Sequence, residues 1–266
     1  MIKTRVILPL LVLFVVLFGG MFLRRRASSS ATQQGSVLVV AMMSGWAPFM
    51  TINGAGQFEG FDVDVAQEIA QRMNRQLVIE DLGSLPACFI ALDQQRVAMV
   101  LSDLDITQKR LERVAMIRYT GQEEKQYGLM FWNEIPAGMR SLDDIKNFSD
   151  AVICVESGSS QEKFLDYYGF VTKKRMNSMM DMVLDIRFGK SFAAVAELRI
   201  AARLARQNPE IKILPIDLPQ DFQVLGCGIA LKKENVQLID DVSRVITQMY
   251  NDGTLARLEK KWQLEE

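Results

Sequence analysis

The sequence predicts an α/β fold built from two similar halves. From residue 37 onward, short apolar segments of strand length alternate with segments whose apolar residues repeat at helical spacing. The helical repeat is clearest in one segment, where a single face carries Phe61, Val65, Ile69 and Met73. The same alternation starts again near residue 126. Alternating strands and helices favour a largely parallel sheet with helices packed against it, so we expect two such halves.

In the first half the pattern predicts three strands and three helices. The expected strands are 37–42, 77–80 and 97–101, and the expected helices are 61–73, 87–92 and 108–115. Thr107 precedes the third helix and is a suitable N-cap, because its hydroxyl can accept a bond from an unpaired backbone N–H.

The second half continues in the same way. Its expected strands are 127–132, 151–155, 192–195 and 211–214, and its expected helices are 142–147, 161–168, 178–187 and a basic one ending near 207. The segment 224–231 that follows is apolar and contains glycines. The chain then closes with an expected helix at 236–250 and a final amphipathic turn at 255–262. We therefore expect two lobes with crossover connections between them.

Composition excludes several functions. The 266 residues carry a formal charge of -1, which does not suit a nucleic-acid-binding protein. The chain has no histidine, so histidine-based triads and imidazole metal ligands are excluded. Cys88, Cys154 and Cys227 lie far apart in apolar segments without a CxxC pair, and we expect buried thiols, no metal site and no cofactor.

The first 26 residues differ from the rest. Lys3 and Arg5 precede an apolar run at 6–23, which is typical of a signal peptide but is also long enough to span a membrane. No small-residue cleavage site follows it, which favours an uncleaved anchor. Three arginines at 24–26 leave the orientation open, because basic residues tend to stay cytoplasmic. Residues 27–36 are rich in Ser and Gln and predict a linker.

Two turns carry side chains suited to a small charged ligand. Trp46 lies beside Pro48 at the end of the first strand, where its ring can stack on a ligand rather than pack in a core. Arg110 lies in the first turn of a helix, and its guanidinium can form two parallel bonds with a carboxylate. Turns at strand ends are where open α/β sheets bind ligands, so we expect a binding protein rather than an enzyme.

Seven motifs occur in an order and spacing that resemble a known family. They are GWAPF (45–49), GQFEGFDVDVAQEIAQRM (56–73), DITQKR (105–110), GSSQ (158–161), RFGKSFAAVAE (187–197), VLGCGIAL (224–231) and NDGTLARLEKKWQL (251–264). They are similar to the periplasmic amino-acid-binding proteins of ABC importers, the extracellular solute-binding proteins of family 3. The last two also resemble arginine-binding proteins of the chlamydial type.

The resemblance implies a type II periplasmic-binding-protein fold. Each of its two lobes would have a mixed sheet flanked by helices, and two crossover strands would join them. Lobe 1 would comprise 37–123 and 225–266, and lobe 2 would comprise 124–224. The implied function is to trap an amino acid by hinge closure and deliver it to an ABC permease, and we expect a periplasmic monomer.

The resemblance also assigns ligand-binding residues. Trp46 would stack on the ligand, Arg110 would take its α-carboxylate with help from Ser102, Asp103 and Asp105, and Glu197 would take its α-ammonium. Lobe 2 would add the turn Ser159, Ser160 and Gln161. From the residues alone, the two serines could be helix caps, and Glu197 could be paired with Arg199 or Arg203. Asp62 and Asp64 are expected on the solvent side of their helix.

Two departures from the family pattern bear on the ligand. Relatives carry small hydroxyl residues at the positions of Asp103 and Asp105, where ionised aspartates repel a carboxylate. Met43 replaces an acid or polar residue that several relatives have there. The hypothesis is a more acidic pocket that prefers arginine or another cationic ligand.

Two other functions compete with transport. A membrane-tethered sensor or scavenger could use the same fold without a transporter. A dehydratase-like enzyme is the third alternative, since the acids at 103, 105 and 197 could transfer protons, but no catalytic residue is expected.

Overall fold

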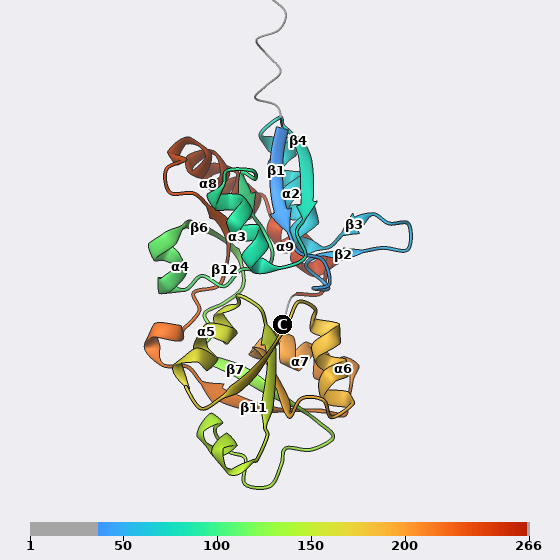
Figure 1. Ribbon diagram of the computed structural model, residues 1–266. Coiled ribbons are helices and arrows are strands. Elements are labelled where there is room, and N and C mark those ends of the chain that lie inside the picture. Colours follow the sequence, from blue (N-terminus) through green and yellow to red (C-terminus); the bar gives the residue numbers. More distant parts are fainter. Residues whose placement is uncertain (1–36, 265–266) are drawn as a thin grey trace, which may run out of the picture. The chain divides into compact units, whose positions relative to one another are not determined.

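Two five-stranded sheets organise the chain, as the computed structural model shows for residues 37–264 (Figure 1). The predicted signal peptide or anchor at 1–26 and the linker at 27–36 lie outside the described residues. Within 37–264, none of the helices combines the length and apolar character needed to cross a membrane.

The first sheet takes strands from both ends of the chain. Its order is β4-β1-β5-β12-β6, formed by Gln76–Asp81, Val37–Met42, Met99–Val100, Cys227–Leu231 and Ala115–Thr120. The accompanying helices are α2 (Phe61–Arg72), α3 (Leu85–Asp93), α4 (Gln108–Arg113), α8 (Val236–Asn251) and α9 (Thr254–Lys261), and a small hairpin pairs β2 (Thr51–Ile52) with β3 (Phe58–Glu59). Since β1 and β5 are parallel while β12 is antiparallel to β5 and β6, the sheet is mixed.

The second sheet comes from the middle of the chain. Its order is β11-β7-β10-β8-β9, formed by Ile211–Asp217, Gln126–Trp132, Ala193–Glu197, Val152–Glu156 and Thr172–Met176. The accompanying helices are η1 (Leu142–Asn147), α5 (Ser160–Tyr167), α6 (Met179–Arg187), α7 (Leu198–Gln207) and the short η2 (Gln220–Phe222). This sheet is also mixed, because β8 is parallel to β9 and β10 whereas β7 is antiparallel to β10 and β11. The mixed α/β fold that the resemblance implies is confirmed, whereas the largely parallel sheets expected from the alternation alone are not observed, because the strands beside each crossing run antiparallel.

We call the first sheet with its helices lobe 1 and the second sheet with its helices lobe 2. The chain passes between them twice, at 121–125 and at 218–226. Glu124 and Val224 pair there as an antiparallel bridge, with N–O distances of 2.9 and 3.0 Å in the two directions. The predicted boundaries at 123/124 and 224/225 remain a proposal, which this bridge supports.

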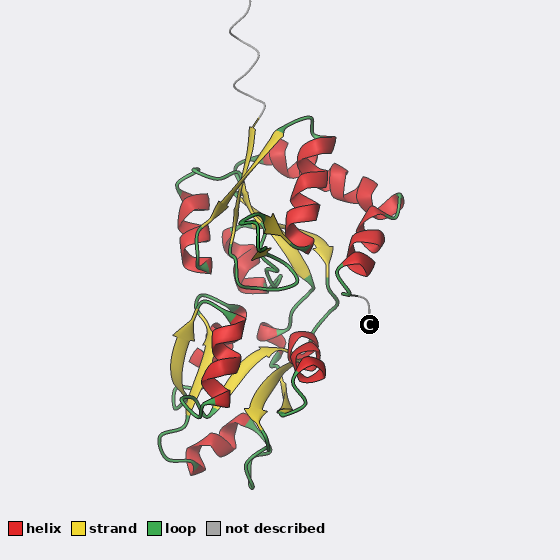
Figure 2. Ribbon diagram, turned by 90° about the vertical axis from the view of Figure 1, so that its right-hand side faces the viewer, coloured by secondary structure: helices red, strands yellow, loops and turns green. Residues whose placement is uncertain are grey.

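Burial explains why these segments form the sheets. Every residue of β10 and of β12 is buried, as expected for central strands covered on both faces. Helices lie on the faces of both sheets (Figure 2). The predicted apolar face of α2 is buried through Phe61, Val65 and Ile69. This face holds the helix against the first sheet.

Three local features differ from the sequence prediction. The helix expected to reach residue 115 ends at Arg113, and β6 follows it at once. Strand β9 contains lysines and an arginine whose alternation gave no strand signal. Asp62, expected in solvent, is fully buried, because its carboxylate accepts bonds from the Tyr119 hydroxyl (2.5 Å) and from the backbone N–H of Asp103 (2.8 Å). That expectation was wrong.

Candidate functional site

The turn between β5 and α4 brings several predicted site residues to one edge of the first sheet. Ser102 and Asp105 are buried, with 8% and 2% of their surface exposed, and Asp103 is partly buried. Asp103 has a positive φ of 47°, a backbone conformation in which its N–H reaches Asp62. The buried carboxylate of Asp62 thus fixes the path of this turn.

Arg110 is held at the start of α4. Thr107 caps the helix as predicted, accepting a bond from the Arg110 backbone N–H at 3.2 Å. The Arg110 guanidinium donates to the Asp105 backbone carbonyl at 2.8 Å and lies 5.9 Å from the centre of the Phe89 ring. No carboxylate among residues 37–264 forms a salt bridge with it. Its remaining N–H groups can therefore bind an anionic group of a ligand.

Trp46 follows β1 in a tight turn. Its backbone pairs with Met50 in both directions, at 3.1 and 3.0 Å. The side chain is half-buried, and its indole N–H has no hydrogen-bond partner among the described residues. Met43, the earlier departure from the family pattern, is 1% exposed and belongs to the core.

In lobe 2 the predicted turn leads into α5. Ser159 caps this helix, since its hydroxyl accepts from the Glu162 N–H at 3.0 Å and donates to the Glu156 carbonyl at 2.8 Å. Ser160 and Gln161 follow and are buried. Since Ser159 caps the helix, the side chains of Ser160 and Gln161 are free to bond residues outside α5.

Those side chains join residues of the two lobes. Asp105 Oδ2 accepts bonds from the Ser160 hydroxyl and from Gln161 Nε2, the latter at 3.2 Å. The same Gln161 amide donates to Glu197 Oε1 at 2.5 Å. We call Asp105 and Glu197 the acid pair. One amide group therefore bridges a carboxylate of lobe 1 and a carboxylate of lobe 2.

The acid pair is poorly compensated electrostatically. Burial raises the pKa of the Asp105 carboxyl, and the Arg110 guanidinium opposes that shift. Burial, and next the Asp105 charge, raise the pKa of Glu197 well above its usual range. Asp105 Oδ1 is buried without a hydrogen-bond partner among the described residues. A cationic donor placed beside this pair would satisfy both acids.

Asp103 has a different environment. Its carboxylate forms an ion pair with Arg199 of α7, with Nη2 2.8 and 2.9 Å from the two oxygens. From the sequence Arg199 is a possible partner of Glu197, but its hydrogen bonds go to Asp103 and Glu124 instead. The charge of Asp103 is thereby neutralised.

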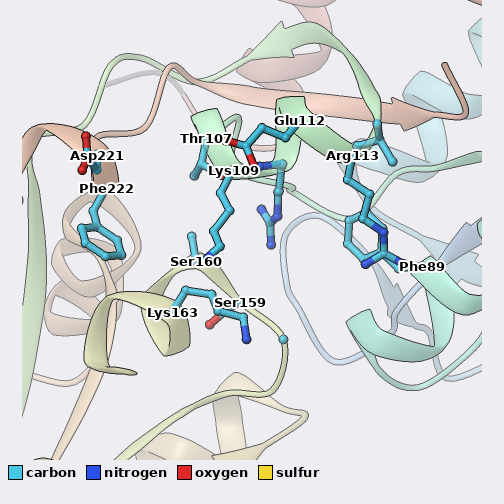
Figure 3. Close-up of a pocket in the computed structure, with 13 residues that line it drawn as sticks. Phe89, Thr107, Lys109, Glu112, Arg113, Ser159, Ser160, Lys163, Asp221 and Phe222 are labelled. Carbon is cyan, nitrogen blue, oxygen red and sulfur yellow. Dashed lines mark hydrogen bonds between the residues drawn. The ribbon is translucent and has the colours of Figure 1, made fainter. Parts of the chain in front are cut away.

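A pocket of about 450 Å³ lies between the two lobes. Neither acid of the acid pair lines it, but Ser160 and Arg110, which both bond Asp105, do. We call it the inter-lobe pocket. Lobe 1 contributes Phe89, Thr107, Lys109, Arg110, Glu112, Arg113 and Val114, and the facing side contributes Gly158, Ser159, Ser160, Lys163, Asp221 and Phe222 (Figure 3). Three of the predicted site residues, Arg110, Ser159 and Ser160, line it. It offers a solute access to the Arg110 guanidinium.

The lobes touch at two glycines near this site. A Cβ atom on Gly158 would lie 2.9 Å from Pro86 of α3, and one on Gly45 would lie 3.7 Å from the Cβ of Ser178. The absence of a side chain at Gly158 thus permits close approach.

Sequence reasoning missed other groups of the site. Burial raises the pKa of Glu124 to about 7 and that of Glu156 well above its usual range, so two further acids lie near Asp105 and Asp103. Their only signal in the sequence is position, since Glu156 ends β8 and Glu124 lies in the first crossing, two residues before β7. Among the described residues, no cluster of acidic or cysteine side chains is suited to a metal ion.

Comparison with known proteins relates this geometry to a family. The sequence model described as bacterial extracellular solute-binding proteins, family 3, matches residues 38–265. The probable ABC transporter arginine-binding protein ArtJ of Chlamydia trachomatis is 30% identical over 226 residues, which cover 85% of each chain. A histidine-binding periplasmic protein of Escherichia coli is 25% identical over 224 residues, covering 82% of this chain and 84% of that one. The resemblance read from the motifs is confirmed.

Solved structures share the fold. The arginine-binding protein ArgBP of T. maritima, in its P235GK mutant, superimposes with a TM-score of 0.75 at 22% identity, over 87% of this chain and 96% of that chain. The Salmonella typhimurium periplasmic protein STM4351, whose structure concerns high arginine specificity, gives 0.74 at 18% identity, over 85% and 99% of the two chains. Both are similar in fold.

Proposed function

The chain belongs to family 3 of the bacterial extracellular solute-binding proteins, and from this premise we propose that it captures a cationic amino acid, with arginine as the leading candidate. Capture would proceed by closure of the two lobes over the solute. Relatives named for arginine and histidine binding support an amino acid as the ligand class.

The observation that carries the proposal is the acid pair. Asp105 and Glu197 come from different lobes, are both buried, and share a single amide donor on Gln161. Asp105 Oδ1 has no donor among the described residues. An ammonium or guanidinium group between the lobes would supply the missing N–H donors and the missing positive charge.

Arg110 supplies the complementary charge. An amino acid whose carboxylate binds the Arg110 guanidinium in the inter-lobe pocket could direct its cationic group toward the acid pair. The ring of Trp46 is proposed to stack on the ligand, and Ser102, Ser159 and Ser160 to border it. Because Asp103 is neutralised by Arg199, it is not expected to bind the solute directly.

The family relationship extends the proposal to transport. Delivery to an ABC permease, a periplasmic location, a monomeric state and an anchor at residues 6–23 are all expected and form part of the proposal. A tethered sensor would share the same site, and a pull-down that recovers no permease or ATPase would favour it. The similarity to binding proteins supports binding without catalysis.

Isothermal titration of the purified protein with four solutes tests the ligand class. The probes are arginine, agmatine (arginine without its carboxylate), citrulline (arginine with a neutral side chain) and glutamate. We expect arginine to bind most tightly and glutamate not to bind. The affinity for arginine should fall about 10- to 150-fold in an Arg110→Ala variant, because one or two charge-assisted hydrogen bonds to the carboxylate are lost. The affinity for agmatine, which has no carboxylate, should change little.

Two results would overturn this assignment. Tight glutamate binding would show that the acid pair does not set the charge of the ligand. An equal loss for arginine and agmatine in Arg110→Ala would show that Arg110 does not bind the carboxylate.

A further inference from the structure

Arg199 connects lobe 2 with lobe 1 and with the first crossing, through contacts separate from those of the acid pair. It lies in the first turn of α7 in lobe 2, two residues after Glu197. Its Nη2 bonds both carboxylate oxygens of Asp103 in lobe 1, and its Nε bonds Glu124 in the first crossing at 3.0 Å. Its side chain is only 23% exposed.

Two more contacts reach lobe 1. Nη2 lies 3.2 Å from the sulfur of Cys227, where β12 begins after the second crossing. The guanidinium carbon lies 5.3 Å from the centre of the Phe49 ring, a cation–π distance. The polar and aromatic partners of Arg199 thus all lie in lobe 1 or in the first crossing.

Asp103, the lobe 1 partner of this ion pair, is anchored by its own hydrogen bonds. The backbone N–H of Asp103 is bound to Asp62, whose other oxygen accepts the Tyr119 hydroxyl. These bonds hold the backbone of Asp103, which carries the carboxylate, on the core of lobe 1. The ion pair with Arg199 therefore connects α7 to the first sheet through Asp103, Asp62 and Tyr119.

We propose that Arg199 is a positioning residue that holds lobe 2 against lobe 1 in the absence of solute, by bridging Asp103 and Glu124. The bond geometry also fixes the N-terminal turn of α7, and with it Glu197, opposite Asp105. The proposal rests on the lobe closure of the proposed function, but not on which solute binds. In this role Arg199 lowers the free energy of lobe closure, which brings the solute-binding residues of the two lobes together.

A matched control lies one helical turn away. Arg203 has the same side chain on the same helix, but among the described residues it forms no bond to lobe 1, and its Nη1 has no partner. An Arg203→Ala variant therefore removes a similar charge from α7 while the contact with Asp103 is kept.

The experiment measures the distance between lobes by double electron–electron resonance. Spin labels would be placed at Gln67 in lobe 1 and Ser149 in lobe 2, both exposed, in full-length protein whose native cysteines are buried. The wild type, Arg199→Ala, Asp103→Asn and Arg203→Ala would be compared without solute and with saturating arginine. Arginine titrations of the same proteins would give their affinities.

We expect the closed population of solute-free Arg199→Ala to fall about tenfold, the change that one charge-assisted pair gives. Because the binding-competent fraction scales apparent affinity, arginine affinity should fall by the same factor. Asp103→Asn should behave alike, Arg203→Ala should match the wild type, and saturating arginine should close every variant. If Arg199→Ala does not fold, Asp103→Asn provides the same comparison.

Two outcomes would overturn different claims. Unchanged distances without solute in both Arg199→Ala and Asp103→Asn, with arginine still closing the lobes, would refute the role of Arg199 alone. If titration detects no binding of any solute of the panel to the wild type or the variants, the proposed function is refuted instead.

Discussion

Replacing Asp105 by asparagine removes one negative charge from the solute site and nearly preserves the shape of the side chain. In the wild type, Oδ2 already accepts two bonds from lobe 2, and Oδ1 accepts none. If a cationic group of the solute binds there, the variant loses a charge-assisted bond of ~1.5–3 kcal/mol. Arginine and agmatine should then bind about 10- to 150-fold more weakly.

The same change should affect stability in the opposite direction. The Asp105 charge is buried, and burial raises the pKa of its carboxyl, so the ionised form is costly in the solute-free protein. The asparagine oxygen can still accept a bond from Ser160. We expect Asp105→Asn to be more stable by about 1 kcal/mol, or to melt ~2–4 °C higher.

Titration calorimetry and thermal melts of one preparation check both effects. An Asp240→Asn variant serves as the control, because Asp240 is exposed on α8 and the substitution removes the same charge. It should change neither quantity. If Asp105→Asn instead melts several degrees lower and binds arginine as well as the wild type does, the carboxylate is structural and the reasoning is refuted.

Three further predictions concern pH and closure. Because burial raises the pKa values of the acid pair, protons compete with a cationic solute for the two carboxylates, so arginine affinity should fall as the pH is lowered. Calorimetry in buffers of different ionisation enthalpy should detect proton release on binding. Gly158→Ala should weaken arginine binding through a clash with Pro86, whereas Gly138→Ala, which also has a positive φ but open space around it, should not. The pKa of Asp62 is raised to about 8, so the folded protein keeps a proton on this carboxyl that the unfolded chain releases above about pH 4. The free energy of unfolding should therefore decrease as the pH rises from about 4 toward 8. Denaturant melts of Asp62→Asn should show a smaller decrease over this range.

Local patterns in the sequence predicted most of the elements. The apolar repeat of α2, the Thr107 cap before α4 and the apolar runs of β1 and β10 depend on neighbouring residues, and the structure has each of them. The family could also be read from seven spaced motifs, because they record which turns the fold requires.

The errors arise where distant contacts override local preference. Asp62 looks like a solvent-facing residue near a helix N-terminus, but Tyr119, 57 positions away, makes its burial tolerable. Strand β9 carries three cationic side chains that bond acids of α5 and α6, so its stability depends on partners outside its own pattern.

The two aspartates that depart from the family pattern have different physical roles, and only the structure separates them. Both precede Arg110 in the sequence, and both could be taken as its partners. Asp103 instead meets Arg199, 96 positions away, which cancels its charge and places it outside the proposed contacts with the solute. The Asp105 carboxylate accepts hydrogen bonds only from neutral donors of lobe 2, while the nearby Arg110 guanidinium, which bonds the Asp105 backbone carbonyl, offsets part of its burial. One acid therefore brings the lobes together through a built-in cation, and the other, by the same electrostatic argument, requires a cation that the solute must bring.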